Sequence, residues 1–111
     1  MSDIRIEKIR FSMLDRVKTS DLEKYDMLVM AISDEDLKKI LPTSKELGRI
    51  YAHFLESNKH IVLIPLKGRK KFTREHYLYR LEKLLSRYIE LHLEKSGLNI
   101  LLIYDFPEMI K

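Results

Sequence analysis

The sequence contains no cysteine, so it has neither disulfide bonds nor a metal site built on thiolate ligands. It also lacks any apolar run near the roughly 20 residues of a transmembrane helix. The longest such stretches cover only residues 27–33 and 61–66. The first residues have no apolar segment like that of a secretory signal. We therefore expect a cytoplasmic chain without membrane partners.

Glycine is scarce too, with only three residues, at positions 48, 68 and 97. They form no dinucleotide-binding fingerprint and no phosphate-binding P-loop, and no serine-hydrolase motif is present. The histidines at positions 53, 60, 76 and 92 never fall three or four residues apart, which argues against a metal site. We expect neither a metal nor another cofactor.

What the sequence does contain is charge and aliphatic side chains. Hydrophobic residues make up 45% and charged residues 34% of the 111 residues, which indicates one folded domain spanning residues 1–111. The absence of Trp and Gln, together with abundant Lys, Arg, Glu, Ile and Leu, is typical of thermophilic proteins. Positive charge is concentrated in residues 67–74, which hold five basic residues and no acidic one.

Four segments have the apolar patterns of β-strands. Residues 4–11 alternate between apolar and charged side chains, as in a strand with one face in water at a sheet edge. Residues 27–32, 60–66 and 99–106 are mainly apolar, which is typical of strands buried on both faces of a parallel sheet. Residues 15–24 are polar and predict a loop or a marginal helix.

Helical patterns lie between these strands. Residues 34–41 form a short helical turn that Pro42 ends. From Lys45, apolar side chains at positions 47, 50, 51, 54 and 55 form one face of an amphipathic helix. The longest helix runs from Arg74 to about residue 96, with Thr73 as its N-cap and Gly97 as its stop. Its broad apolar stripe predicts core contacts or the face of a homodimer.

Strands and helices that alternate in this way predict an α/β fold. We expect a small Rossmann-like three-layer sandwich, with a mostly parallel sheet of about four strands, right-handed crossovers and helices on both faces. Ligands of such sheets bind outside the carboxyl ends of the strands. That edge would collect Asp34 and Asp36 after the second strand, residues 67–74 after the third and Asp105 after the fourth. It suits a small anionic or ribose-bearing ligand.

Each of these residues also has a purely structural interpretation. Residues 43–46, Thr-Ser-Lys-Glu, fit a capping box in which Thr43 and Glu46 accept from each other's backbone amides. Acidic residues 34–36 are typical of a solvated turn that leads into a helix. The basic residues 67–74 suit either a solvated loop or contacts with phosphate groups.

Two stretches resemble a known family. "SDLEKYDMLVMAIS" (residues 20–33) and "TSKELGRIYAHFLESNKHIVLI" (residues 43–64) are similar to the nucleoside 2-deoxyribosyltransferase-like superfamily. The matching positions are Asp21, Asp26, Thr43, Glu46, Gly48, Ala52 and residues 59–62. Pro42 stands where the family has a glycine.

The resemblance implies that Glu46 is the nucleophile that attacks the anomeric carbon of a nucleoside. It also implies that Asp34 or Asp36 handles the base, and that the protein is a dimer or larger. Thr43, Arg69, Lys70, Lys71 and Asp105 are the candidate ligand-binding residues, with the basic ones on a phosphate.

Three functions are therefore predicted. The chain is an enzyme that cleaves or exchanges an N-glycosidic bond, or it binds a nucleoside or nucleotide without turnover. Alternatively, it is a non-catalytic module that binds nucleic acid or protein through the basic loop 67–74, with the long C-terminal helix as a dimer face.

Overall fold

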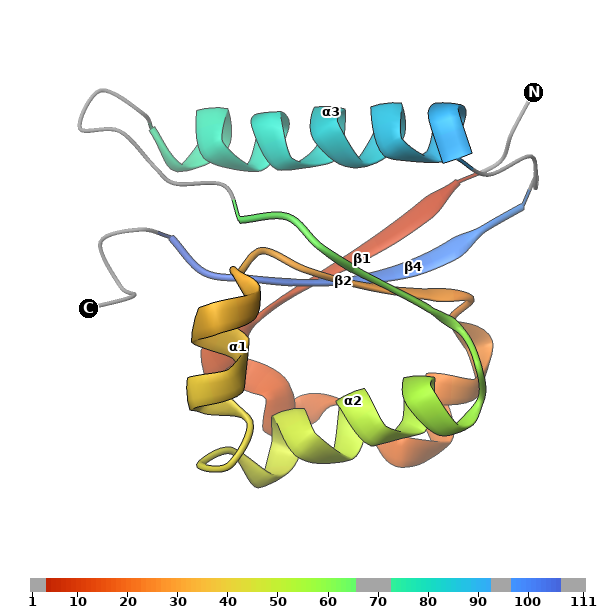
Figure 1. Cartoon of the computed structure of the whole chain (residues 1–111). Coiled ribbons are helices and arrows are strands. Elements are labelled where there is room, and N and C mark those ends of the chain that lie inside the picture. The colour runs from red at the N-terminus through yellow and green to blue at the C-terminus, as the bar shows by residue number, and fades with distance from the viewer. Residues whose placement is uncertain (1–3, 66–72, 93–96, 107–111) are drawn as a thin grey trace.

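The protein is described by a computed structural model that covers residues 4–65, 73–92 and 97–106. Its centre is a sheet of four parallel strands in the order β1-β4-β2-β3 (Figure 1). The strands are β1 (Arg5–Arg10), β2 (Met27–Met30), β3 (His60–Leu63) and β4 (Asn99–Tyr104). The predicted α/β fold of the Rossmann-like type is confirmed.

Helices cover both faces of this sheet, which gives three layers (Figure 1). Helix α3 (Arg74–His92) lies on one face, and α1 (Asp34–Ile40) and α2 (Lys45–Glu56) lie on the other. The crossovers from β1 to β2 and from β2 to β3 move across the sheet in one direction on the α2 face. The crossover through α3 returns in the opposite direction on the other face, so all three share one hand, as parallel sheets require.

The two middle strands carry the core. All four residues of β2 are buried, and so are four of the six residues of β4, because each strand has neighbours on both sides and helices on both faces. β1 lies at a sheet edge, as its alternating pattern predicts. β3 corrects a prediction, since residues 60–66 were expected to form a buried strand. β3 has only four residues, and only Val62 among them is buried. Because β2 pairs with β4 on its other side, β3 is left at the second edge of the sheet.

The crossover between β1 and β2 is more ordered than its polar sequence suggests. Instead of a loop or marginal helix, it forms two 3₁₀ helices, η1 (Phe11–Arg16) and η2 (Thr19–Lys24). Leu14 and Leu22 from these turns are buried in the same apolar layer as the underside of α2. Burial of these two leucines therefore helps to hold the segment against the sheet.

Helix α3 follows its sequence pattern closely. Tyr77, Leu81, Leu85 and Ile89 recur every fourth residue and are buried against the sheet. The Thr73 hydroxyl accepts a hydrogen bond from the amide of His76 at 3.1 Å, which confirms the predicted N-cap. In the described part of the chain, no helix combines the length and the apolar character needed to cross a bilayer.

Candidate functional site

The carboxyl ends of the four strands meet at one edge of the sheet. In Figure 1, α1 and the first turns of α2 and α3 also lie at this edge. Of the residues predicted to form a site, Asp34, Asp36, Thr43, Glu46 and Asp105 are described by the structure. Arg69, Lys70 and Lys71 lie outside the described residues.

The start of α2 differs from the predicted capping box. Ser44 is the N-cap, because its hydroxyl accepts a hydrogen bond from the amide of Leu47 at 3.2 Å. The Thr43 hydroxyl instead donates to the carbonyl of Ile40 at 2.9 Å, and the Thr43 amide donates to the same carbonyl. Thr43 therefore closes the end of α1, and the prediction of Thr43 as the N-cap of α2 is wrong. Glu46 is consequently the second helical residue rather than the third.

Glu46 is bound by an arginine one turn further along α2. Its Oε2 lies 2.6 Å from Nη2 of Arg49, and the Glu46 side chain remains 44% exposed. The same Arg49 donates to the carbonyl of Val17 at 2.6 Å and to the hydroxyl of Thr19 at 2.9 Å. Glu46 thus takes part in a structural link between α2 and the β1–β2 crossover.

The acidic residues at the start of α1 have ordinary helix-starting roles. Ser33 caps the helix by accepting from the amide of Asp36 at 3.1 Å. Asp34 pairs with Lys38 one turn later at 3.0 Å, with both side chains well exposed. Negative charge in a first turn is favourable because the helix N-terminus carries a partial positive charge. Glu46 and Asp34 are thus held by two different cations.

Asp105 lies in a more unusual setting directly after β4. It is the only polar residue classed as buried within the described residues, and its Oδ1 accepts from Nη2 of Arg10 at 3.2 Å. Oδ1 also accepts from the backbone amide of Phe106 at 2.9 Å. Arg10 is the last residue of β1, which pairs with β4. The ion pair therefore joins the carboxyl ends of two neighbouring strands.

A second arginine reaches the same place from α3. The guanidinium carbon of Arg74 lies 4.8 Å from the centre of the Phe106 ring, and that of Arg10 lies 5.2 Å from it. Both distances are within the range of cation–π attraction. Since Arg74 is the first residue of α3, the helix N-terminus adds a partial positive charge here. Two guanidinium groups thus lie against the Phe106 ring, one of them paired with Asp105 and the other at the start of α3.

Tyr77 of α3 is the buried residue that packs against Phe106 in this group. It is almost fully buried, and its ring centre lies 6.0 Å from that of Phe106. Burial raises the pKa of the Tyr77 hydroxyl, and the negative charge of Asp105 raises it further. The phenol therefore stays protonated at neutral pH. We call Arg10, Arg74, Asp105, Phe106 and Tyr77 the edge cluster.

From the edge cluster, sequence reasoning placed Asp105 and Arg74, the last residue of the basic segment 67–74, at this edge, but it missed Arg10 and Tyr77. Arg10 looked like an ordinary charged residue of an edge strand, and Tyr77 like one member of a core stripe. A signal was nevertheless present, because Arg10 and Asp105 both stand at the carboxyl ends of predicted strands. Their adjacency depends on β4 pairing with β1, which the strand patterns do not specify.

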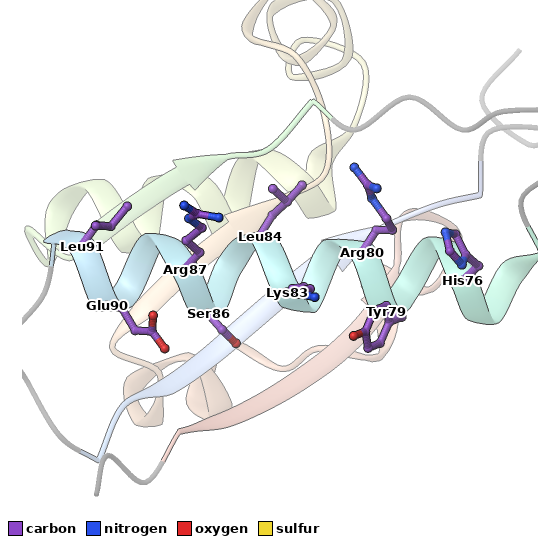
Figure 2. Close-up of a pocket in the computed structure, with 9 residues that line it drawn as sticks. All are labelled: His76, Tyr79, Arg80, Lys83, Leu84, Ser86, Arg87, Glu90 and Leu91. Carbon is purple, nitrogen blue, oxygen red and sulfur yellow. The ribbon is translucent and has the colours of Figure 1, made fainter.

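The second notable surface is the outer face of α3. Among the described residues, nine side chains of this helix line an open hollow of about 710 Å³, and Figure 2 draws them. They are His76, Tyr79, Arg80, Lys83, Leu84, Ser86, Arg87, Glu90 and Leu91. Leu84 belongs to the stripe that predicted a core or dimer contact, yet it is exposed, as are Tyr79 and Leu91. The homodimer stays a prediction.

Neither metal binding nor family membership gains support from these data. Within the described ranges, no three His, Asp or Glu side chains gather closely enough to hold a metal ion. No family model, no curated protein and no solved structure matches the chain. The resemblance of residues 20–64 to deoxyribosyltransferases therefore stays a prediction.

Proposed function

We propose that this chain binds a nucleotide at the carboxyl edge of its sheet, with the edge cluster as the binding site. The observation that carries the proposal is the convergence of Arg10 and Arg74 on the Phe106 ring. These residues are far apart in the sequence, and they meet where ligands of parallel sheets bind. A phosphorylated ligand is the chemistry that best fits this arrangement.

The charge of the edge cluster favours a phosphate group. Within the edge cluster, Arg10, Arg74 and the N-terminus of α3 supply positive charge against the carboxylate of Asp105, and Glu75 adds a carboxylate in the first turn of α3. Guanidinium groups and helix N-termini are the usual partners of phosphate oxygens. A phosphate would therefore lie against Arg74 and the first turn of α3.

Asp105 supplies an acceptor for the sugar. Among the described residues, its hydrogen bonds from Arg10 and Phe106 both go to Oδ1. The second oxygen, Oδ2, can accept from a ribose hydroxyl, in the manner of the acidic residues that bind ribose at other parallel-sheet edges. Phosphate and ribose together define a nucleotide rather than a free phosphate ion.

Binding without turnover fits the geometry better than cleavage of the N-glycosidic bond. Glycosidic chemistry requires two carboxyl groups placed around one anomeric carbon. Here Glu46 and Asp34 pair with Arg49 and Lys38, and Asp105 pairs with Arg10. These three separate ion pairs favour structural roles for the carboxylates, so we expect no release of base.

Titration calorimetry with mononucleotides tests the proposal. We expect Arg74→Ala to weaken binding at least about tenfold, as the loss of one charge-assisted hydrogen bond implies. Arg5→Ala is the matched control, since it removes the same charge from an exposed position at the opposite end of β1. Nucleosides without phosphate should bind more weakly than nucleotides.

Two results would overturn the proposal. One is that no nucleotide binds, and the other is that Arg74→Ala and Arg5→Ala reduce affinity equally. Chromatography of the same mixtures separates binding from catalysis. Free base that appears with the wild type and disappears with Glu46→Gln would establish the enzyme instead.

A further inference from the structure

We propose that the outer face of α3 is a docking surface for single-stranded nucleic acid, whose phosphates contact Arg80, Lys83 and Arg87. This surface is distinct from the edge cluster, and the inference does not depend on nucleotide binding there. It uses residues that neither the core nor the edge cluster requires. Figure 2 shows Arg80 and Arg87 on one flank of the helix, with Lys83 between them along its axis on the side nearer Tyr79.

The spacing of the cations suits a phosphate backbone. Arg80, Lys83 and Arg87 follow one another at three and four residues, so they project from the same side of the helix. At about 1.5 Å per residue they extend over about 10 Å of the helix axis. Neighbouring cations in this row therefore lie about 4.5–6 Å apart along the helix axis, which lets each reach a different phosphate of an extended single strand. The three cations can therefore contact consecutive phosphates.

Tyr79 adds a platform for a base at the edge of this row. Its side chain is 58% exposed, and Nζ of Lys83 lies 5.6 Å from the centre of its ring. An exposed aromatic ring next to cations is the combination by which proteins hold single strands without reading their sequence. Ser86, on the same flank as Lys83 in Figure 2, can donate a further hydrogen bond to phosphate or sugar.

The composition of the face argues against two other occupants. A membrane surface would require a continuous apolar stripe, but Arg87 interrupts the row between Leu84 and Leu91 (Figure 2). A second copy of the chain would bring the three cations of one helix against those of the other, and among the described lining residues only Glu90 is acidic. A polyanion complements this charge directly.

Fluorescence anisotropy with a labelled pyrimidine oligonucleotide at several salt concentrations tests the inference. We expect Lys83→Glu with Arg87→Glu to weaken binding more than about tenfold. The slope of log affinity against log salt should fall by about 1.4, since each lost phosphate contact on a single strand contributes about 0.7. Lys38→Glu with Lys39→Glu on α1 is the matched control and should leave both quantities nearly unchanged.

Tyr79 provides an independent readout. Tyr79→Phe should retain binding because its ring can still stack, whereas Tyr79→Ala should weaken binding several-fold at every salt concentration. Circular dichroism of each variant verifies that α3 is intact. Equal loss in the α3 and α1 charge variants would overturn the inference, and so would tighter binding to a duplex than to a single strand.

The other occupants give distinct results. Binding of anionic vesicles by the wild type that is lost in the α3 charge variant, without any oligonucleotide binding, would assign the face to a membrane. Light scattering that shows a dimer dissociated by Lys83→Glu with Arg87→Glu, again without oligonucleotide binding, would assign it to a second copy. Either result would refute the proposed nucleic-acid surface.

Discussion

Arg49 holds Glu46 and the carbonyl of Val17 with the same nitrogen, at 2.6 Å each. The first contact lies within α2, while the second crosses to the chain between η1 and η2. One arginine thus fixes the crossover that follows β1 and orients the carboxylate that the sequence singles out as a nucleophile. The two contacts have different energetic weight because the Glu46 side chain remains 44% exposed, whereas Val17 is buried.

We expect Arg49→Met to lower the free energy of unfolding by about 1–2 kcal/mol, because the Val17 carbonyl loses a charged donor. Glu46→Gln should cost no more than about 0.5 kcal/mol, since a half-exposed pair within one helix contributes little. Urea denaturation followed by circular dichroism measures both. Equal losses in the two variants would contradict this assignment.

The N-cap of α2 gives a second test. Ser44→Ala removes the acceptor of the Leu47 amide and should destabilise the protein by about 1 kcal/mol. Thr43→Ala is the matched control, since within the described residues its exposed hydroxyl bonds only to the Ile40 carbonyl, so we expect a smaller loss. Thermal unfolding compares the two variants. A larger effect at Thr43 would restore the capping box predicted from sequence.

The error at this cap shows what local sequence patterns can and cannot determine. Thr43 and Ser44 are both good N-cap residues, and the spacing to Glu46 favours Thr43. The structure selects Ser44 because the end of α1 already uses the amide and hydroxyl of Thr43. A short connection between two helices couples their ends, and a motif considered for one helix misses that coupling.

The fold was predictable for a different reason. Buried apolar runs and amphipathic helices alternate along the chain, and this alternation specifies an α/β class with a parallel sheet. The order of strands is not encoded in that way. Placing β4 between β1 and β2 brings Arg10 beside Asp105, and it also leaves β3 at the edge. The edge cluster is therefore a product of topology that the sequence patterns alone do not reveal.

The raised pKa of Tyr77 predicts that the free energy of unfolding falls at alkaline pH. Burial and the charge of Asp105 raise the pKa of its hydroxyl above the usual 10.0. As the pH rises past that value, the unfolded chain releases this proton while the folded chain keeps it, so the folded state is progressively destabilised. The stabilising contribution is fully present below pH 10 and is lost as the pH rises through the folded-state pKa. Denaturation of the wild type and Tyr77→Phe at alkaline pH measures it.

Tyr77→Phe should lose stability less steeply with pH than the wild type. Asp105→Asn isolates the smaller of the two causes, because it removes the charge but leaves Tyr77 buried. Spectrophotometric titration of the phenol should then give a pKa below that of the wild type but still above the usual value. A normal pKa in Asp105→Asn would mean that the carboxylate, not burial, is the main cause.

The variant Gly48→Ala tests whether this helix position lacks a side chain in order to leave room for a ligand. Gly48 lies inside α2, and a Cβ atom added there would meet nothing within 4 Å. Because glycine weakens a helix, Gly48→Ala should raise the free energy of unfolding by about 0.4–1 kcal/mol. Ala52→Gly, at an exposed position one turn later, should lower it by a similar amount.

If Gly48→Ala stabilises the protein and leaves nucleotide affinity unchanged, the glycine has no role in binding. If it stabilises the protein but abolishes binding, the ligand approaches the α2 backbone at this point, and the site lies beside α2 rather than at the edge cluster.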